Sequence, residues 1–181
     1  MSILENIKHL VSESIKSDSP HFIFITGSAG TGKTTLVKKL RKEFNKSVTV
    51  APTGVAALTC RGQTIHSLFK FKVGTPLSRL VKGKRVKGPN KKVIENLELL
   101  IIDEISMVSA PMLDAISESL KKIKKNQEPF GGITILASGD LCQLPPVITK
   151  EEESQLKKLS YTSRYFFSSN SFSEVRQAGR F

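Results

Sequence analysis

The hydrophobic and polar positions of this chain follow two different periods. Four short, mainly apolar segments occur, at 22–26, 47–51, 97–103 and 132–138. Their length and their β-branched residues predict buried strands. Between them, apolar residues recur every three or four positions, as they do in the helix expected over 33–44. Strands that alternate with helices in this way predict an α/β fold with a mostly parallel sheet flanked by helices.

The remaining segments complete the expected organisation. Residues 1–20 are interpreted as a leading helix and linker, and 21–181 as an ATPase domain. Within that domain, 70–92 is lysine-rich and broken by glycine and proline, which predicts an exposed, basic excursion. The last segment, 151–181, is poorly periodic and is expected to form a tail.

Charge and cysteine content narrow the classes of function. The 28 Lys and Arg residues outnumber 16 acids, a net charge of +12, which favours polyanionic partners or reflects a generally lysine-rich surface. No apolar run approaches the roughly 20 residues of a membrane helix, and the N-terminus mixes acids with lysines, unlike a secretion signal. Cys60 and Cys142 lie far apart without a zinc-type spacing. A cytoplasmic protein is expected, associated with the nucleoid if bacterial.

A glycine-rich segment follows the first expected strand. It reads GSAGTGKTT and matches the phosphate-binding loop, with a chance glycine turn as the alternative. Its amides are expected to surround phosphate oxygens, with Lys33 on the β- and γ-phosphates and the Thr34 hydroxyl on Mg²⁺. ATP and Mg²⁺ are the expected cofactors. The candidate nucleotide-binding residues are Gly27, Ser28, Ala29, Gly30, Thr31, Gly32, Lys33, Thr34 and Thr35.

Two acids end the third expected strand. Asp103 and Glu104 follow the apolar run LLII, at the sheet edge where parallel α/β proteins bind ligands. Asp103 is the candidate magnesium ligand, and Glu104 is the candidate base that orients and deprotonates the attacking water. The alternative is a solvated pair that only caps the strand.

The segment GDLCQLPPV, 139–147, follows the fourth expected strand and should reach the same edge. The neutral amide of Gln143 is suited to sensing a γ-phosphate or to positioning water. The alternative is a stiff turn in which Asp140 caps a helix.

Two further segments, APTGVAAL at 51–58 and GQTIHSLF at 62–69, combine small residues with hydroxyls. Such residues can contact phosphates without steric bulk, and His66 could stack on a base. The alternative is that His66 satisfies a local hydrogen bond and Phe69 packs in a core. The candidate phosphate contacts are Thr53, Gly54, Thr64 and Ser67.

Taken in order, the motifs GSAGTGKTT, APTGVAAL, GQTIHSLF, LLIIDEISMV and GDLCQLPPV resemble the first motor domain of Pif-type, RecD-like superfamily 1B DNA helicases. The resemblance covers about 22–148, with a weaker echo at 161–169. It implies a RecA-like P-loop NTPase that hydrolyses ATP, tracks single-stranded DNA from 5′ to 3′ and unwinds fork-type DNA in repair or recombination. It assigns catalysis to Glu104, Lys33 and Gln143. It also implies a single-strand path lined by Pro52, Thr53, Gly54, Thr64, His66 and Ser67.

The chain departs from that family pattern in two ways. A second RecA-like domain, whose arginines complete the ATP site, has no counterpart before Phe181, which predicts a fragment completed by the same natural chain or in trans. The Arg176-Gln177 pair resembles the opening of the family's next motif but lacks its flanking structure. No glutamine precedes Gln63, so the family's adenine-reading glutamine is absent or replaced. The alternative function is a P-loop nucleic-acid-binding or regulatory ATPase module completed by a partner.

Overall fold

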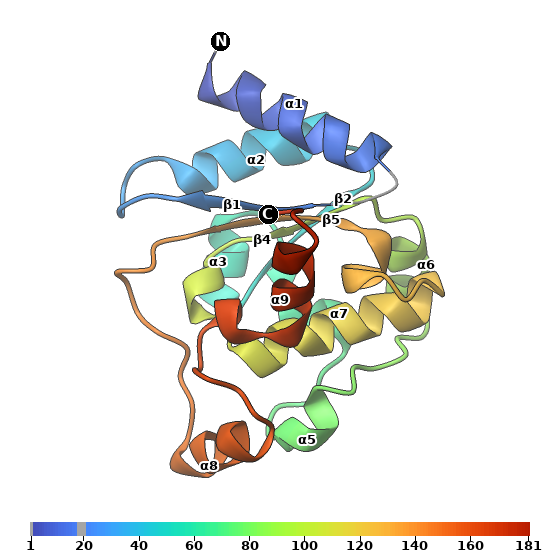
Figure 1. Cartoon of the computed structure of the whole chain (residues 1–181). Coiled ribbons are helices and arrows are strands. Elements are labelled where there is room, and N and C mark those ends of the chain that lie inside the picture. Colours follow the sequence, from blue (N-terminus) through green and yellow to red (C-terminus); the bar gives the residue numbers. More distant parts are fainter. Residues whose placement is uncertain (1, 18–20) are drawn as a thin grey trace.

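Over residues 2–17 and 21–181, which the computed structural model describes, the chain forms a five-stranded sheet (Figure 1). The strands are β1 (Phe22–Thr26), β2 (Ser47–Ala51), β3 (Gln63–Thr64), β4 (Leu99–Ile102) and β5 (Thr134–Gly139). Their order is β1-β5-β4-β2-β3, and every neighbouring pair is parallel. The predicted α/β class is therefore confirmed. The predicted linker at 18–20 lies outside the described residues.

Helices cover both faces of the sheet. They are α1 (Ile3–Lys16), α2 (Lys33–Glu43), α3 (Gly54–Thr59), α4 (Ile65–Phe69), α5 (Leu77–Leu80), α6 (Pro89–Glu95), α7 (Ala110–Lys124), α8 (Lys150–Lys158) and α9 (Asn170–Gln177), with the 3₁₀ turns η1 (Ile105–Met107), η2 (Pro129–Gly132) and η3 (Phe166–Ser168). Helices α1 and α2 lie on one face, and α7 and α9 lie on the other (Figure 1). None of the described helices is long and apolar enough to cross a membrane.

The two faces explain why the central strands are apolar throughout. In β4, Leu99 and Ile101 pack with the helices α1 and α2, whereas Leu100 and Ile102 belong to the larger core on the α7 side. All four side chains are buried. A strand buried on both faces shows a continuous apolar run instead of an alternating one.

The strand register gathers the candidate chemistry at one edge. Thr26, the last residue of β1, lies opposite Gly139, the last residue of β5, and Ile102 of β4 lies opposite Ala137. The glycine-rich loop, the acidic pair and the segment after β5 therefore leave the sheet side by side. Parallel sheets place ligands at this carboxyl edge.

The lysine-rich segment 70–92 is folded onto the core, so its interpretation as an exposed excursion was wrong in part. It contains α5 and the start of α6, and its apolar residues Phe71, Leu77, Leu80 and Val86 are buried. Its cations are exposed. Glycine and proline interrupt the periodicity of this segment. Its apolar residues pack against the core individually, so they form no periodic pattern that would predict their burial.

The C-terminal segment is also ordered. Although its sequence is poorly periodic, it forms α8, η3 and α9, and it places Phe166 and Phe172 in the core. The ring centroids of these residues lie 6.2 and 5.1 Å from that of Phe22 in β1. Contacts with a strand far away in the chain define this segment, and local periodicity does not reveal them.

One buried carboxylate ties this segment to α7. Asp114 accepts hydrogen bonds from the Tyr161 hydroxyl at 2.6 Å and from the backbone amides of Asn170 and Ser171 at 3.0 and 2.8 Å. Asp114 is 4% exposed. Burial, followed by the hydrogen bond to Asp114, raises the pKa of Tyr161 well above its ordinary value. Because those amides open α9, the carboxylate also satisfies donors that the helix itself leaves free.

Candidate active site

The glycine-rich loop runs from the end of β1 to the start of α2. Gly30 and Gly32 have φ values of 78° and 88°, a left-handed conformation that a side chain disfavours. Gly32 occupies the N-cap position of α2, where no described side chain caps the helix. The amides at this helix start are therefore left to bind an anion, and the helix dipole favours negative charge there.

The Lys33 side chain folds back over the loop. Its ammonium donates hydrogen bonds to the carbonyl oxygens of Gly27 and Ser28, at 2.5 and 2.8 Å. The positive charge is thus held beside the backbone that precedes the helix.

A hydroxyl from α2 and a carboxylate from the end of β4 meet at the sheet edge. Thr34 Oγ1 donates to Asp103 Oδ2 at 3.2 Å, although the two residues are 69 positions apart. Ser138 Oγ donates to the other oxygen of Asp103, Oδ1, at 2.6 Å. Asp103 is 2% exposed, so these contacts hold a buried carboxylate in place.

These groups fit a magnesium ion. Hydroxyl and carboxylate oxygens are the hard ligands that Mg²⁺ prefers, and it usually takes one or two carboxylates, with phosphates and water completing the shell. In the part of the chain that the structure describes, no cluster of three or more His, Cys, Asp or Glu residues could hold a metal. The Thr34–Asp103 pair supplies one hydroxyl and one carboxylate, the kind of partial ligand set that Mg²⁺ completes with phosphates and water. Ser138, which orients Asp103, was missed from the sequence, although its place at the end of β5 was a usable signal.

Glu104 has an uncommon backbone conformation and an altered acidity. Its φ and ψ are 56° and 45°, the left-handed region that a non-glycine residue seldom adopts and that is frequent at functional sites. Burial raises the pKa of Glu104, and the charges of Asp103 and Asp140 raise it further, while Lys33 opposes the shift. A carboxylate with a raised pKa is a stronger proton acceptor, which suits a general base.

Gln143 shares a pocket of about 280 Å³ with the acidic pair and Thr34. Its Nε2 donates to Asp140 Oδ2 at 3.0 Å, and the other oxygen of Asp140 accepts from the Cys142 amide at 3.0 Å. Asp140 therefore closes a turn, and the described chain starts no helix at that point. The thiols of Cys60, which is buried, and Cys142, which is exposed, are both free.

The hydroxyls proposed to contact DNA first serve the fold. Thr53 Oγ1 accepts from the Ala56 amide and caps α3, and Thr64 Oγ1 accepts from the Ser67 amide and caps α4. Each hydroxyl keeps its hydrogen for another acceptor. Thr53 also lines the pocket of Glu104 and Gln143, so the structure places it nearer the nucleotide site than its motif indicated.

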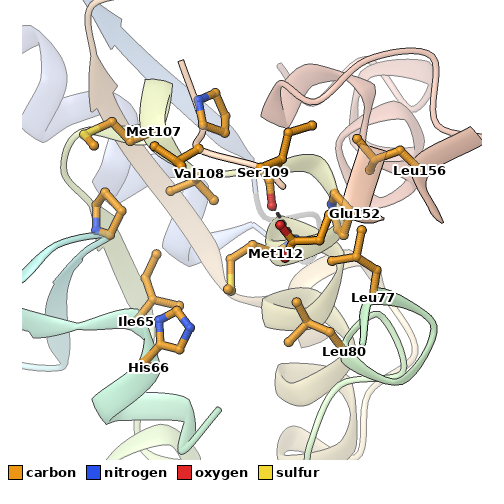
Figure 2. A pocket seen from close by; sticks show the side chains of 15 residues that line it. Ile65, His66, Leu77, Leu80, Met107, Val108, Ser109, Met112, Glu152 and Leu156 are labelled. Carbon is orange, nitrogen blue, oxygen red and sulfur yellow. Dashed lines mark hydrogen bonds between the residues drawn. The ribbon is translucent and has the colours of Figure 1, made fainter. Parts of the chain in front are cut away.

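Pro52 and His66 line a different pocket, of about 210 Å³. Figure 2 shows His66 on one side of it and Glu152 on the other, among mainly apolar side chains. Burial lowers the pKa of His66. Gly54 and Ser67 are exposed outside this pocket, whereas Phe69 is fully buried, as the alternative interpretation held.

This fold and this site define an α/β domain of the P-loop nucleotide-binding class. A family model described as PIF1-like helicase matches residues 4–177. The chain belongs to the PIF1-like helicase family, and the resemblance seen in its motifs is confirmed.

Individual relatives agree with the family match. The ATP-dependent DNA helicase PIF1 of Candida albicans is 41% identical over 157 residues, which cover 82% of this chain and 17% of that protein. Human PIF1 is 40% identical over 128 residues, covering 69% of this chain and 20% of that protein. The crystal structure of Bacteroides Pif1 helicase in complex with ADP-AlF3 and ssDNA has a TM-score of 0.82 at 38% identity, covering 97% of this chain and 41% of that chain. The RecA-like fold is therefore confirmed, and the chain spans about a fifth of the length of these curated relatives.

Proposed function

We propose that this chain is the first motor domain of an ATP-dependent DNA helicase, which binds ATP and magnesium and couples hydrolysis to movement along single-stranded DNA. One observation carries the proposal: the Thr34 hydroxyl and the Asp103 carboxylate meet beside the phosphate loop, with Glu104 next to them. The relatives named ATP-dependent DNA helicases support the choice of reaction. Direction of travel and fork-type substrates remain part of this proposal.

The residues have separate tasks in the proposed reaction. The loop amides and Lys33 bind the β- and γ-phosphates. Mg²⁺, held by Thr34 and Asp103, would neutralise charge on those phosphates. Glu104 orients a water molecule and takes its proton as the water oxygen bonds to the γ-phosphorus and the bond to ADP breaks. Gln143 senses the γ-phosphate.

The proposed site lacks one charge that such reactions use. No arginine of the described chain lines the pocket of Asp103, Glu104 and Gln143. An arginine supplied from another domain or protein contributes roughly 10³–10⁵ in rate to related phosphoryl transfers. The 181-residue chain is therefore expected to bind Mg·ATP but to hydrolyse it slowly until a second RecA-like domain, in the same natural chain or in trans, supplies that arginine.

Replacing Lys33 by alanine tests the nucleotide site. The variant loses a charge-assisted contact with phosphate, so its affinity for Mg·ATP should fall by about 10- to 100-fold. Titration with a fluorescent ATP analogue measures the change. Lys38→Ala, on the same helix but away from the loop, is the matched control and should bind like the parent chain. Equal affinity in the Lys33 variant and the parent would contradict the proposal.

The exposed cations of 70–92 provide a test of DNA contact. If Lys82, Arg85 and Lys87 touch phosphates, replacing all three by glutamine should flatten the slope of log affinity against log salt by about 0.7 per lost contact on single-stranded DNA. Fluorescence anisotropy of a labelled oligonucleotide measures that slope. A charge-matched variant on α2, with Lys38, Lys39 and Lys42 changed to glutamine, lies on the opposite face of the sheet from α5 and should leave it unchanged (Figure 1). If the variant in 70–92 also kept the slope of the parent chain, these three cations would not contact DNA phosphates.

A second candidate function is a P-loop module that binds nucleic acid as a nucleotide-dependent switch, or a regulatory ATPase completed by a partner. The described residues that line the pocket include no arginine, which is compatible with this candidate. DNA affinity that depends on ATP, with no hydrolysis even when a second RecA-like domain is added, would favour this candidate.

A further inference from the structure

Ser106 presents a buried hydroxyl for which the described part of the chain offers no partner. The residue lies in η1, two positions after Glu104, and is 1% exposed. Among the described residues nothing hydrogen-bonds its Oγ. A buried hydroxyl that loses its hydrogen bonds to water without gaining others destabilises the fold. Such a group in a native protein therefore calls for an explanation, such as a functional role.

The backbone around Ser106 is closely packed. At Gly139, the end of β5, an added Cβ would lie 3.2 Å from the Ser106 amide nitrogen and 3.0 Å from Ile105 Cγ2. The strand end and η1 therefore touch almost directly. A close backbone contact of this kind holds the turn in one position.

Ser106 borders the pocket of the proposed nucleotide site. Ser106 lines the cavity of about 280 Å³ that also contains Thr34, Glu104 and Gln143. An unpartnered donor at the border of a pocket that also holds two carboxylates indicates a position for a group that enters from elsewhere.

Among the described residues that line this pocket, Gln143 is the one with a side-chain amide. Its side chain is exposed and is held by the contact of Nε2 with Asp140 Oδ2, at 3.0 Å. Within the described chain no donor reaches its Oε1. A single, partly buried hydrogen bond contributes little net free energy, so it can exchange when a competing partner is offered.

We propose that Ser106 is a positioning residue, which holds the carboxamide of Gln143 inside the pocket when a nucleoside triphosphate is bound. The Ser106 hydroxyl donates to Gln143 Oε1, and the amide leaves Asp140. Both N–H donors of that amide then face the γ-phosphate, because a carboxamide has one acceptor end and one donor end. The inference rests on the proposed nucleotide site. It gives the Gln143 side chain two positions: it bonds to Asp140 when a diphosphate is bound, and to Ser106 when a triphosphate is bound.

The test compares Ser106→Ala with the parent chain for binding of Mg·ADP and of a non-hydrolysable ATP analogue, by calorimetry. The variant should bind the ATP analogue about 3- to 10-fold more weakly, the size of one neutral hydrogen bond, and should bind ADP unchanged. Gln143→Ala should show a similar loss. The double variant should lose no more than either single variant, since the two groups act through one contact.

Thermal unfolding separates this role from a structural one. Removal of an unpartnered hydroxyl should leave the unfolding temperature of Ser106→Ala unchanged or raise it. Ser119→Ala is the matched control: its buried hydroxyl donates to the Ala115 carbonyl and accepts from the Lys84 amide, so its loss should lower that temperature without altering nucleotide preference.

An unchanged ratio of the two nucleotide affinities in Ser106→Ala would overturn the inference, as would losses in the two single variants that add in the double variant. Those results leave the nucleotide site intact. A parent chain that binds neither nucleotide would instead overturn the proposed function, and the role of Ser106 with it.

Discussion

Replacing Glu104 by glutamine is expected to lower single-turnover hydrolysis of ATP by about 10²–10⁴-fold, the usual contribution of a general base. Glutamine keeps the size of the side chain and its contacts but cannot accept a proton from water. Affinity for Mg·ATP should stay within about twofold, because the interaction that is lost is made only in the transition state. Quenched-flow measurement of phosphate release, with enzyme in excess over ATP, separates this step from product release.

The control for that variant is Glu98→Gln. Glu98 precedes β4 and forms an exposed ion pair with Lys46 at 2.6 Å, away from the nucleotide pocket. Its replacement should leave hydrolysis unchanged, since an exposed ion pair contributes little. If Glu104→Gln hydrolysed ATP at the parent rate, another group would be the base.

Replacing Asp114 by alanine is expected to remove about 3–5 kcal/mol from the free energy of unfolding, because it leaves three buried or half-buried donors without their charged acceptor. Those donors are the Tyr161 hydroxyl and the first amides of α9. Domains are typically stable by only about 5–15 kcal/mol, so the unfolding temperature should fall by about 6–20 °C. Urea titration followed by circular dichroism gives the free energy directly.

Tyr161→Phe separates the contribution of the Tyr161 hydroxyl from that of the α9 amides. It removes one donor and leaves Asp114 bonded to Asn170 and Ser171, so the loss should be about 1–2 kcal/mol. A loss below about 1 kcal/mol in Asp114→Ala would show that α9 does not depend on the carboxylate.

Much of the fold could be predicted because its signals are local. The strands at 22–26 and 47–51 were predicted at the bounds that the structure shows. Their apolar residues follow one period over several turns or positions, and this pattern needs no knowledge of distant residues. The segments 70–92 and 151–181 gave no such signal, since each apolar residue there packs against a different part of the core.

The sequence by itself determined the phosphate loop, the acidic pair and their arrival at one sheet edge. Glycines and a lysine at fixed spacing define such a loop locally, and the carboxyl ends of parallel strands converge whatever surrounds them. Only the tertiary structure decided that Ser138 bonds to Oδ1 of Asp103 and that Thr53 and Thr64 cap helices. It also decided that no described residue hydrogen-bonds to the Ser106 hydroxyl. A hydrogen bond depends on the distance and direction between two groups, and for groups distant in the chain only packing sets those quantities.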